Sequence, residues 1–303
     1  VAASDVYKRQ QGTVVRTPLS NTLVYASVHC SLLEQLDALS QIGGVCDLSY
    51  IKTPALLSRA ENGKLTDAGN SMSPDIERVM SLNPDAILLS PFENAGYGRI
   101  GKMGIPIIEC ADYLETSPLG RAEWIKFFGL LYGKEVETDS IFTEVEKNYT
   151  ELRNKIGILS SAPVVISELK SGSAWYMPGG KSYMARFFKD AGAAYPWSDN
   201  PETGSIPLSF ETVFNRAGEA DIWLIKSFNV SELSYRTLQK EYAPYARFKA
   251  FREKKIYGCD SSRCNYYEET PFRPDLLLQE LAALFHPGLF PDYRFRYYQP
   301  LSE

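Results

Sequence analysis

The sequence predicts an α/β protein with two lobes, each a mostly parallel sheet flanked by helices, joined by one long α-helix. Three observations favour this fold class. Short apolar runs alternate with helical patterns in both halves of the 303 residues, which is typical of parallel sheets covered by helices. A long amphipathic stretch lies between the halves, and a segment of the first half matches a segment of the second.

The first half contains three apolar runs that we expect to form strands. Continuous apolarity predicts buried strands at Ala86–Leu89 and Pro106–Ile108, and a further strand is expected at Leu23–Val28. The apolar periodicity of Ser31–Leu39 predicts a helix, and Gly43–Gly44 predicts the turn that follows it.

Gly133–Ile158 is expected to form one long helix. Apolar residues recur at spacings of three and four along a single stripe, the other faces are charged, and Pro163 follows the end. At 1.5 Å per residue this helix would be roughly 35–40 Å long, about the width of a domain. The stripe consists of Phe142, Val145, Tyr149, Leu152 and Ile156.

The second half repeats the alternation. Strands are expected at Pro163–Ser167 and Ala220–Lys226, and helices at Ser182–Asp190 and Pro274–Leu284, the last ending near His286. The predicted organisation is a non-native leader, an N-terminal α/β lobe, a linking helix and a C-terminal α/β lobe. Their bounds are residues 1–10, 11–132, 133–160 and 161–303.

Residues 1–10 differ from the rest of the sequence. They lack a periodic pattern and resemble translated sequencing-adaptor sequence, so we exclude them from the fold. A signal peptide or a lipid-attachment cysteine would stand at this end of a precursor. The beginning of this sequence therefore does not indicate a cytoplasmic protein.

Composition excludes several classes of function. The chain has 32 basic and 37 acidic residues, a net charge of −5 and no basic cluster, so we expect no nucleic-acid partner. Two histidines cannot build a site from several imidazoles, and uptake of bare zinc or manganese is therefore not expected. No apolar run approaches the roughly 18–20 residues of a membrane span.

The matching segments single out two glutamates. The same pattern occurs in Ser73–Leu89 and in Pro207–Ile225. It consists of a Ser that could cap a helix, a Glu in the first turn, a Val two residues after the Glu, and an Asp that opens an apolar strand. The glutamates are Glu77 and Glu211. Either each carboxylate only complements its helix dipole, or the pair marks two symmetric acidic points on a bilobed surface.

The five cysteines show no paired spacing typical of zinc sites. Cys259 and Cys264 are near enough for a small-loop disulfide in an oxidising compartment. The alternative is that all five are isolated thiols that pack as small apolar residues. The other three are Cys30, Cys46 and Cys110.

Two motifs that suggest chemistry have simpler interpretations. Gly179–Ser182 is not a phosphate loop, because the position five residues before its last Gly is Trp175. The carboxylates Glu109, Asp112 and Glu115 could mimic an acid–base pair, but we expect a solvated loop after a strand.

Several long segments resemble one protein family. Ser117–Lys126, Trp175–Tyr183, Arg273–Asp275 and His286–Pro287 are similar to periplasmic solute-binding proteins of ATP-binding-cassette importers. The resemblance is to the helix-linked class that serves ferric siderophores, haem and cobalamin, and within it to a Bacteroidetes-type subgroup. It extends over nearly the whole chain.

The resemblance implies functional residues in both lobes. Each lobe of such a protein carries a surface Glu that docks on arginines of the permease, and these positions fall on Glu77 and Glu211. The ligand is held between the lobes, on loops at strand ends. The implied ligand contacts are His29, Tyr50, Phe92, Tyr113, Trp175, Tyr176, Tyr183, Phe228, Arg263, Tyr266 and Tyr267.

An aromatic cleft agrees with such a ligand. Tyr and Trp offer flat apolar area with a polar group, which suits a porphyrin, corrin or catechol ring. Arg263 would supply a charge for an anionic ferric catecholate, and His29 could ligate iron or haem. Cobalamin remains an alternative ligand, because an aromatic cleft with few charges suits a corrin equally well.

We therefore expect a non-catalytic substrate-binding protein that delivers a ferric siderophore or haem to the permease and ATPase of an importer. A tetrapyrrole metal chelatase on the same fold is the alternative from another class, with His29 as its available base. We expect a periplasmic monomer, lipid-anchored or free, with no resident cofactor or metal. The sequence does not name the ligand.

Overall fold

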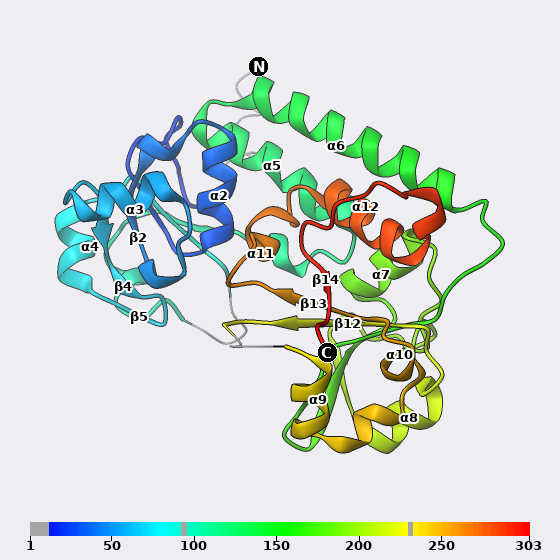
Figure 1. The fold of residues 1–303 in the computed structure, drawn as a ribbon. Coiled ribbons are helices and arrows are strands. Elements are labelled where there is room, and N and C mark those ends of the chain that lie inside the picture. The colour runs from blue at the N-terminus through cyan, green and yellow to red at the C-terminus, as the bar shows by residue number, and fades with distance from the viewer. Residues whose placement is uncertain (1–11, 92–95, 230–232) are drawn as a thin grey trace. The chain divides into compact units, whose positions relative to one another are not determined.

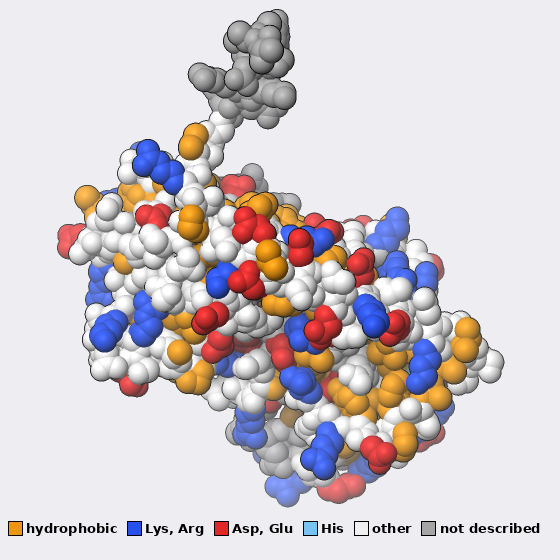
Figure 2. All heavy atoms as spheres, turned by 90° about the horizontal axis from the view of Figure 1, so that it is seen from above, with side chains coloured by type: hydrophobic (Ala, Val, Ile, Leu, Met, Phe, Trp, Pro, Cys, Tyr) orange, Lys and Arg blue, Asp and Glu red, His pale blue; other side chains and the backbone are white. Residues whose placement is uncertain are grey.

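The computed structural model describes residues 12–91, 96–229 and 233–303 (Figure 1). It confirms the predicted α/β fold class, with parallel strands flanked by helices. Among the described residues, no helix combines the length and the apolar character that crossing a bilayer requires. Figure 2 shows acidic and basic side chains interspersed over the face that it displays.

The chain separates into two compact units. Unit 1 combines Val1–Tyr113 with Ile125–Asp139, and unit 2 combines Leu114–Trp124 with Ser140–Glu303. Two consecutive helices, α5 and α6, therefore contribute residues to both units. Their bounds are Pro118–Tyr132 for α5 and Glu135–Ile156 for α6.

Helix α6 corresponds to the long helix that the sequence predicts. The predicted stripe is buried at Phe142, Val145, Tyr149 and Ile156 and half-buried at Leu152, which confirms the orientation expected from the periodicity. Helix α5 was not predicted as a separate element, although its first residues belong to a segment that carries the family resemblance.

Unit 1 contains a five-stranded sheet with the order β3-β2-β1-β6-β7, in which all neighbours are parallel. The strands are β1 Thr22–Val24, β2 Ile42–Val45, β3 Thr66–Asp67, β6 Ala86–Leu89 and β7 Ile107–Glu109. Among the described residues, a two-stranded hairpin and three α-helices also lie wholly within the unit. These are β4 Gly69–Asn70, β5 Ser73–Pro74, α2 Ser27–Gln35, α3 Pro54–Glu61 and α4 Ile76–Leu82.

Two predictions in this unit are wrong. The strand expected over Leu23–Val28 ends at Val24, because α2 already begins at Ser27. The expected turn at Gly43–Gly44 is part of β2 instead. A Cβ at Gly43 would lie 1.7 Å from Asn21 Oδ1, so these glycines allow close packing of the strand and do not form a turn.

Unit 2 contains two sheets. The larger sheet has the order β14-β13-β12-β8, with β8, β12 and β13 parallel and β14 antiparallel. The smaller sheet, β11-β10-β9, is antiparallel. The strands are β8 Val165–Ser167, β9 Lys170–Ser171, β10 Ala174–Pro178, β11 Ser205–Leu208, β12 Ile222–Ser227, β13 Ile256–Asp260 and β14 Gln299–Pro300.

Helices lie on both sides of β12 and β13, with α7 and α12 on one side and α8, α9 and α10 on the other (Figure 1). They are α7 Tyr183–Asp190, α8 Phe210–Ala217, α9 Tyr235–Glu241, α10 Lys249–Arg252, α11 Tyr266–Glu269 and α12 Pro274–Phe285. Short 3₁₀ segments occur at Leu39–Gln41, Leu48–Tyr50, Ile100–Lys102, Asp112–Leu114, Ala243–Arg247 and Pro287–Leu289.

The C-terminal segment of unit 2 is held by one buried carboxylate. Glu280 of α12 is fully buried, and its Oε1 accepts hydrogen bonds from the backbone N–H groups of Tyr297 (2.7 Å) and Tyr298 (2.6 Å). Its Oε2 accepts from the Arg296 N–H (2.8 Å) and the Tyr293 hydroxyl (2.9 Å). These four donors compensate for burying the charge, so the segment leading into β14 is fixed on the helix.

The repeat seen in the sequence is present in the structure. Helix α4 precedes β6, which pairs with the first strand of unit 1, and α8 precedes β12, which pairs with the first strand of unit 2. Glu77 and Glu211 are each the second residue of their helix. Ser209 caps α8 as expected, but the cap of α4 is Asp75, because Ser73 belongs to the hairpin strand β5.

Candidate functional site

The sheet of unit 1 has a topological switch point between β1 and β6. The chain moves outward from β1 through β2 to β3, and then returns to add β6 and β7 on the opposite side of β1. In open parallel sheets, ligands bind outside the carboxyl ends of the strands at such a point. Tyr25 directly follows β1, and Ser90 directly follows β6.

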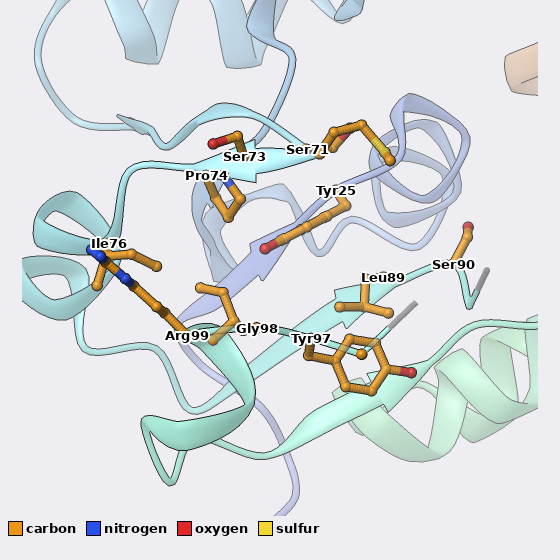
Figure 3. A pocket seen from close by; sticks show the side chains of 13 residues that line it. Tyr25, Ser71, Ser73, Pro74, Ile76, Leu89, Ser90, Tyr97, Gly98 and Arg99 are labelled. Atoms are coloured by element: carbon orange, nitrogen blue, oxygen red, sulfur yellow. The ribbon is translucent and has the colours of Figure 1, made fainter. Parts of the chain in front are cut away.

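A pocket of about 360 Å³ opens at this position. Figure 3 shows Tyr25 lying between the Ser71–Pro74 segment on one side and Leu89 and Tyr97 on the other, while Arg99 extends towards Ile76. The volume is at the small end of the range for small-molecule sites. The lining combines two phenols, three serines and apolar side chains, which suits a ring with polar substituents.

Both phenols of this pocket stay protonated at neutral pH. Burial, with the neighbouring Cys46 thiol, raises the pKa of Tyr25 well above its usual range. Burial and the hydrogen bond that the Tyr97 hydroxyl donates to Glu109 raise the pKa of Tyr97 to about 12. Each phenol therefore presents a neutral hydroxyl group.

The carboxyl ends of β8, β12 and β13 form the corresponding edge of unit 2. Four of the expected ligand residues follow the ends of β12 and β13: Phe228, Arg263, Tyr266 and Tyr267. Phe228 and Tyr267 are about half exposed. The Arg263 side chain is 74% exposed and pairs with Asp260 at 3.3 Å. Arg263 also lines a pocket of about 390 Å³.

An ion pair that the sequence analysis missed lies at the same edge. Glu168 directly follows β8 and pairs with Lys226 of β12. Burial lowers the pKa of Lys226, but the charge and hydrogen bond of Glu168, together with Tyr266 and Tyr267, outweigh it and leave that pKa above its usual range. Lys226 is therefore a charged, mostly buried ammonium group close to Tyr266 and Tyr267.

Glu168 has a left-handed backbone conformation with φ of 64°. A non-glycine residue pays a steric cost there, and such residues persist where their surroundings hold them. The Glu168 N–H donates to Leu224 O at 2.8 Å, and its carbonyl accepts from Trp223 Nε1 at 2.8 Å. These bonds explain how the strained residue is held at the end of β8.

His29, which the resemblance implied as a ligand residue, is instead buried in unit 1. Its Nε2 lies 2.8 Å from Asp112 Oδ1, and its ring centroid lies 5.0 Å from that of Phe128. Asp112 is also buried, so the expectation of a solvated loop is wrong for this residue. His29 and Asp112 hold α2 and the 3₁₀ segment Asp112–Leu114 of unit 1 together and present no surface for contact with a ligand.

Trp175 and Tyr266 are also buried, within unit 2. Trp175 donates a hydrogen bond from Nε1 to Ser167 O (3.0 Å), and its ring packs on Trp223 at a centroid distance of 5.4 Å. Tyr266 is 3% exposed, and its ring contacts Tyr297. Direct ligand contact by either ring is wrong for this structure, because strand and helix packing turns both rings into the core.

The remaining expected contacts have accessible positions. Tyr50 and Tyr113 follow β2 and β7 of unit 1 and are exposed, with the Tyr113 hydroxyl bonded to Pro91 O. Tyr176 projects outward from β10, since the strand alternation buries its neighbours. Tyr183 begins α7, is half-buried and lies under the Arg121 guanidinium, 5.5 Å from the ring centroid. Phe92 lies outside the described residues.

Glu77 and Glu211 are both exposed at the first turns of α4 and α8. The buried residues Val79 and Val213 anchor the two helices at equivalent positions. Within the described part of the chain, no group of three or more His, Cys, Asp and Glu residues is arranged to hold a metal ion.

The sequence profile of the family described as periplasmic binding protein matches residues 30–262. The chain belongs to this family. An uncharacterised lipoprotein of Methanocaldococcus jannaschii is 30% identical over 91% of this chain and 67% of its own length. The petrobactin-binding protein YclQ of Bacillus subtilis is 26% identical over 44% of this chain and 42% of its own length.

Solved structures of periplasmic binding proteins share this fold. The TroA-like protein FepB of Veillonella parvula superposes with a TM-score of 0.69 at 18% identity, over 96% of this chain and 97% of its own. The haem-binding protein HutB of Vibrio cholerae superposes with a TM-score of 0.67 at 19% identity, over 86% of this chain and 98% of its own. At these identities the likeness establishes the fold and leaves the ligand open.

Proposed function

We propose that this periplasmic binding protein captures an iron complex, a ferric siderophore or haem, outside the cytoplasm and delivers it to an ATP-binding-cassette importer. The observation that carries the capture step is the set of aromatic and hydroxyl groups at the carboxyl edges of both sheets. In unit 1 this set surrounds the pocket at the switch point, and in unit 2 it includes Tyr267, Phe228 and Arg263. In each unit taken by itself, such groups suit contact with the flat rings of a chelate.

The charges at these edges favour an anionic or zwitterionic chelate over a bare ion. The Arg263 side chain is accessible, and the charged ammonium of Lys226 is close enough to Tyr267 to interact with it electrostatically. A catecholate or propionate oxygen can share such cations with their present carboxylate partners. The pocket of unit 1, at about 360 Å³, has room for one ring or arm of such a ligand.

Relatives support the same ligand class. YclQ is named for binding petrobactin, and HutB is named for binding haem. The relative from Methanocaldococcus jannaschii is a lipoprotein, which agrees with a place outside the cytoplasm. The Bacteroidetes-type subgroup remains a prediction from the resemblance.

Delivery requires a surface that a permease recognises. Glu77 and Glu211 have equivalent positions in the repeated helix–strand elements of the two units. Among the residues that the structure describes, neither side chain forms an ion pair. Two exposed carboxylates that the fold itself repeats offer matched contacts for basic residues of a permease.

Equilibrium titration of the purified chain tests the capture step. Haemin, a ferric catecholate, a ferric hydroxamate and cobalamin are titrated separately, with binding followed by calorimetry. We expect saturable, submicromolar binding of one of the iron complexes without its chemical conversion. Binding of cobalamin alone, or of none of the four, would overturn the proposed ligand class.

A further inference from the structure

Two cysteines of unit 2 lie in contact at the edge where the candidate ligand residues gather. The Sγ atoms of Cys259 and Cys264 are 3.7 Å apart. Cys259 is buried in β13, and Cys264 is partly exposed. The other three cysteines are buried in unit 1.

The turn between the two cysteines holds them facing each other. The Arg263 N–H donates to Asp260 O at 3.0 Å, and Asp260 Oδ1 accepts from Ser262 N at 3.0 Å. Asp260 Oδ1 also accepts from Asn229 N at 3.2 Å, which ties the turn to the end of β12. A disulfide has an S–S length near 2.05 Å, so the two sulfurs must approach by roughly 1.6 Å, which is within the reach of a side-chain rotation.

We propose that Cys259 and Cys264 form a disulfide in the exported protein and that this bond holds the ligand-binding segment that carries Arg263 and Tyr267. The inference rests on the proposed function, because a place outside the cytoplasm supplies the oxidising compartment. The oxidant is a protein disulfide that reacts by thiol–disulfide exchange.

The exchange proceeds in two balanced steps. The Cys264 thiolate attacks one sulfur of the oxidant, forming a mixed disulfide and releasing one thiolate of the oxidant. The Cys259 thiolate then attacks the Cys264 sulfur, closing the bridge and releasing the second thiolate. The two protons lost by the cysteines are taken up by the oxidant's thiolates, and the oxidant is reduced to a dithiol.

The order of attack follows from exposure and charge. Cys264 is the accessible thiol of the pair, whereas the hydrogen bond to Cys264 and burial disfavour the free Cys259 thiolate. Lys226 is the register partner of Cys259 in the β12–β13 ladder, and its positive charge favours the thiolate during the second step.

The bridge would act on the ligand edge directly. Cys264 stands immediately before Asn265, which precedes α11, and Tyr267 is the second residue of that helix. A bond from Cys264 back to β13 restricts the turn and the start of α11, so less conformational freedom is lost when a ligand binds. We expect reduction of the bridge to weaken binding of the chelate by roughly three- to tenfold.

The test uses the full chain exported to a bacterial periplasm. The protein is denatured and alkylated before and after reduction, and the cysteine peptides are identified by mass spectrometry. We expect Cys259 and Cys264 to be alkylated only after reduction, with Cys30, Cys46 and Cys110 alkylated without it. Full alkylation of Cys259 and Cys264 before reduction, or pairing of either with another cysteine, would overturn the proposal.

Ligand affinity is measured on the same preparations with haemin and a ferric catecholate. Reduction should weaken binding by the wild-type chain and leave binding by the Cys264→Ser variant unchanged. Equal affinity of oxidised and reduced wild-type protein would overturn the role in ligand binding, even if the variant fails to fold. A chain that forms the bridge and binds neither probe, oxidised or reduced, would contradict the proposed function and retain the disulfide.

Discussion

Asp85 in unit 1 and Asp221 in unit 2 make the same contact. Asp85 Oδ2 accepts a hydrogen bond from the Asn21 N–H at 2.9 Å, one residue before β1. Asp221 Oδ2 accepts from the Val164 N–H at 2.8 Å, one residue before β8. Asp85 directly precedes β6 and binds the start of its neighbour β1, and Asp221 directly precedes β12 and binds the start of its neighbour β8. The sequence repeat therefore corresponds to a repeated structural contact.

These carboxylates should make stability sensitive to acid. Hydrogen bonds from Ser20 lower the pKa of Asp85. For Asp221, burial raises the pKa, but the hydrogen bonds from Lys249 and Val164 outweigh burial and leave the pKa below the ordinary 3.8. A carboxylate whose pKa is lower in the folded than in the unfolded state stabilises the fold at pH values above its unfolded-state pKa. This stabilisation is lost as the pH falls through the folded-state pKa. We expect the free energy of unfolding in urea to fall between about pH 5 and pH 2.

The variants Asp85→Asn and Asp221→Asn check the assignment. Each should be less stable than wild type at neutral pH and should lose less stability on acidification. Because Asp85 is exposed, its contribution should be the smaller one and should weaken at high salt. An acid dependence identical to that of wild type in both variants would assign the effect to other carboxylates.

Glu280→Gln should destabilise unit 2 strongly. The amide would direct an N–H group at backbone donors that now meet a carboxylate oxygen, leaving buried donors unsatisfied. We expect a loss of about 3 kcal/mol in the free energy of unfolding, measured in urea. Glu253→Gln, at an exposed position, is the control and should change the free energy of unfolding far less, because solvent screens its ion pair with Lys255. Similar losses in the two variants would contradict the anchoring role of Glu280.

Local patterns in the sequence predict the fold class and the longest helix, but only some of the other helices and strands. The apolar stripe of α6 and the apolar run of β6 follow from periodicity alone, and the structure confirms both. Gly43–Gly44 misled the prediction, because the close approach of Asn21 that requires glycine there comes from a distant part of the chain. Composition suggests a turn at such a pair, and only tertiary packing identifies a strand.

The candidate site was harder to predict, for the same reason. The predicted strand extends to Val28 and therefore includes Tyr25 as a strand residue. In the structure β1 ends at Val24, and Tyr25 lines the pocket at the switch point. Lys226 was predicted only as the last residue of a strand, and its partner Glu168 is 58 residues away in the sequence. His29 and Asp112, 83 residues apart, form a buried pair that no local pattern reveals.

His29→Ala should reduce stability and leave ligand affinity unchanged in the folded protein. Removing the imidazole leaves the buried Asp112 carboxylate without this partner, a change that typically costs about 3–5 kcal/mol. Denaturant unfolding measures the loss. His29→Gln, which keeps a hydrogen-bond donor, should lose less. If His29→Gln instead lowers affinity at unchanged stability, the histidine contacts the ligand after all.

Tyr267→Ala should weaken chelate binding without a comparable loss of stability. The ring is about half exposed at the edge of unit 2, and a stacked aromatic contact is worth about 0.5–1.5 kcal/mol. That range corresponds to roughly two- to tenfold in the dissociation constant, measured by calorimetry. Val136→Ala, at an exposed apolar residue of α6, is the control and should bind as wild type does. Unchanged affinity in Tyr267→Ala would remove this tyrosine from the site.

The paired variant Glu77→Ala, Glu211→Ala should separate delivery from capture. Both carboxylates are exposed at first-turn positions, where their contribution to helix stability is only a few tenths of a kcal/mol. Folding and chelate affinity should therefore be retained. If the two residues dock on basic groups of a permease, each lost ion pair costs about 1.5 kcal/mol or more, so uptake should fall by roughly tenfold or more.

Uptake is measured with the importer reconstituted in vesicles and a radiolabelled iron complex. Glu61→Ala with Glu241→Ala is the matched control, because it also removes one exposed charge from each unit, at the last turn of a helix instead of the first. The control should transport as wild type does. An equal loss of uptake in both paired variants would indicate a general effect of net charge. Loss of chelate binding by the Glu77→Ala, Glu211→Ala variant would place one of these residues in the ligand site. Only a selective loss of uptake, with affinity intact, agrees with two docking points that the repeated fold sets at equivalent positions.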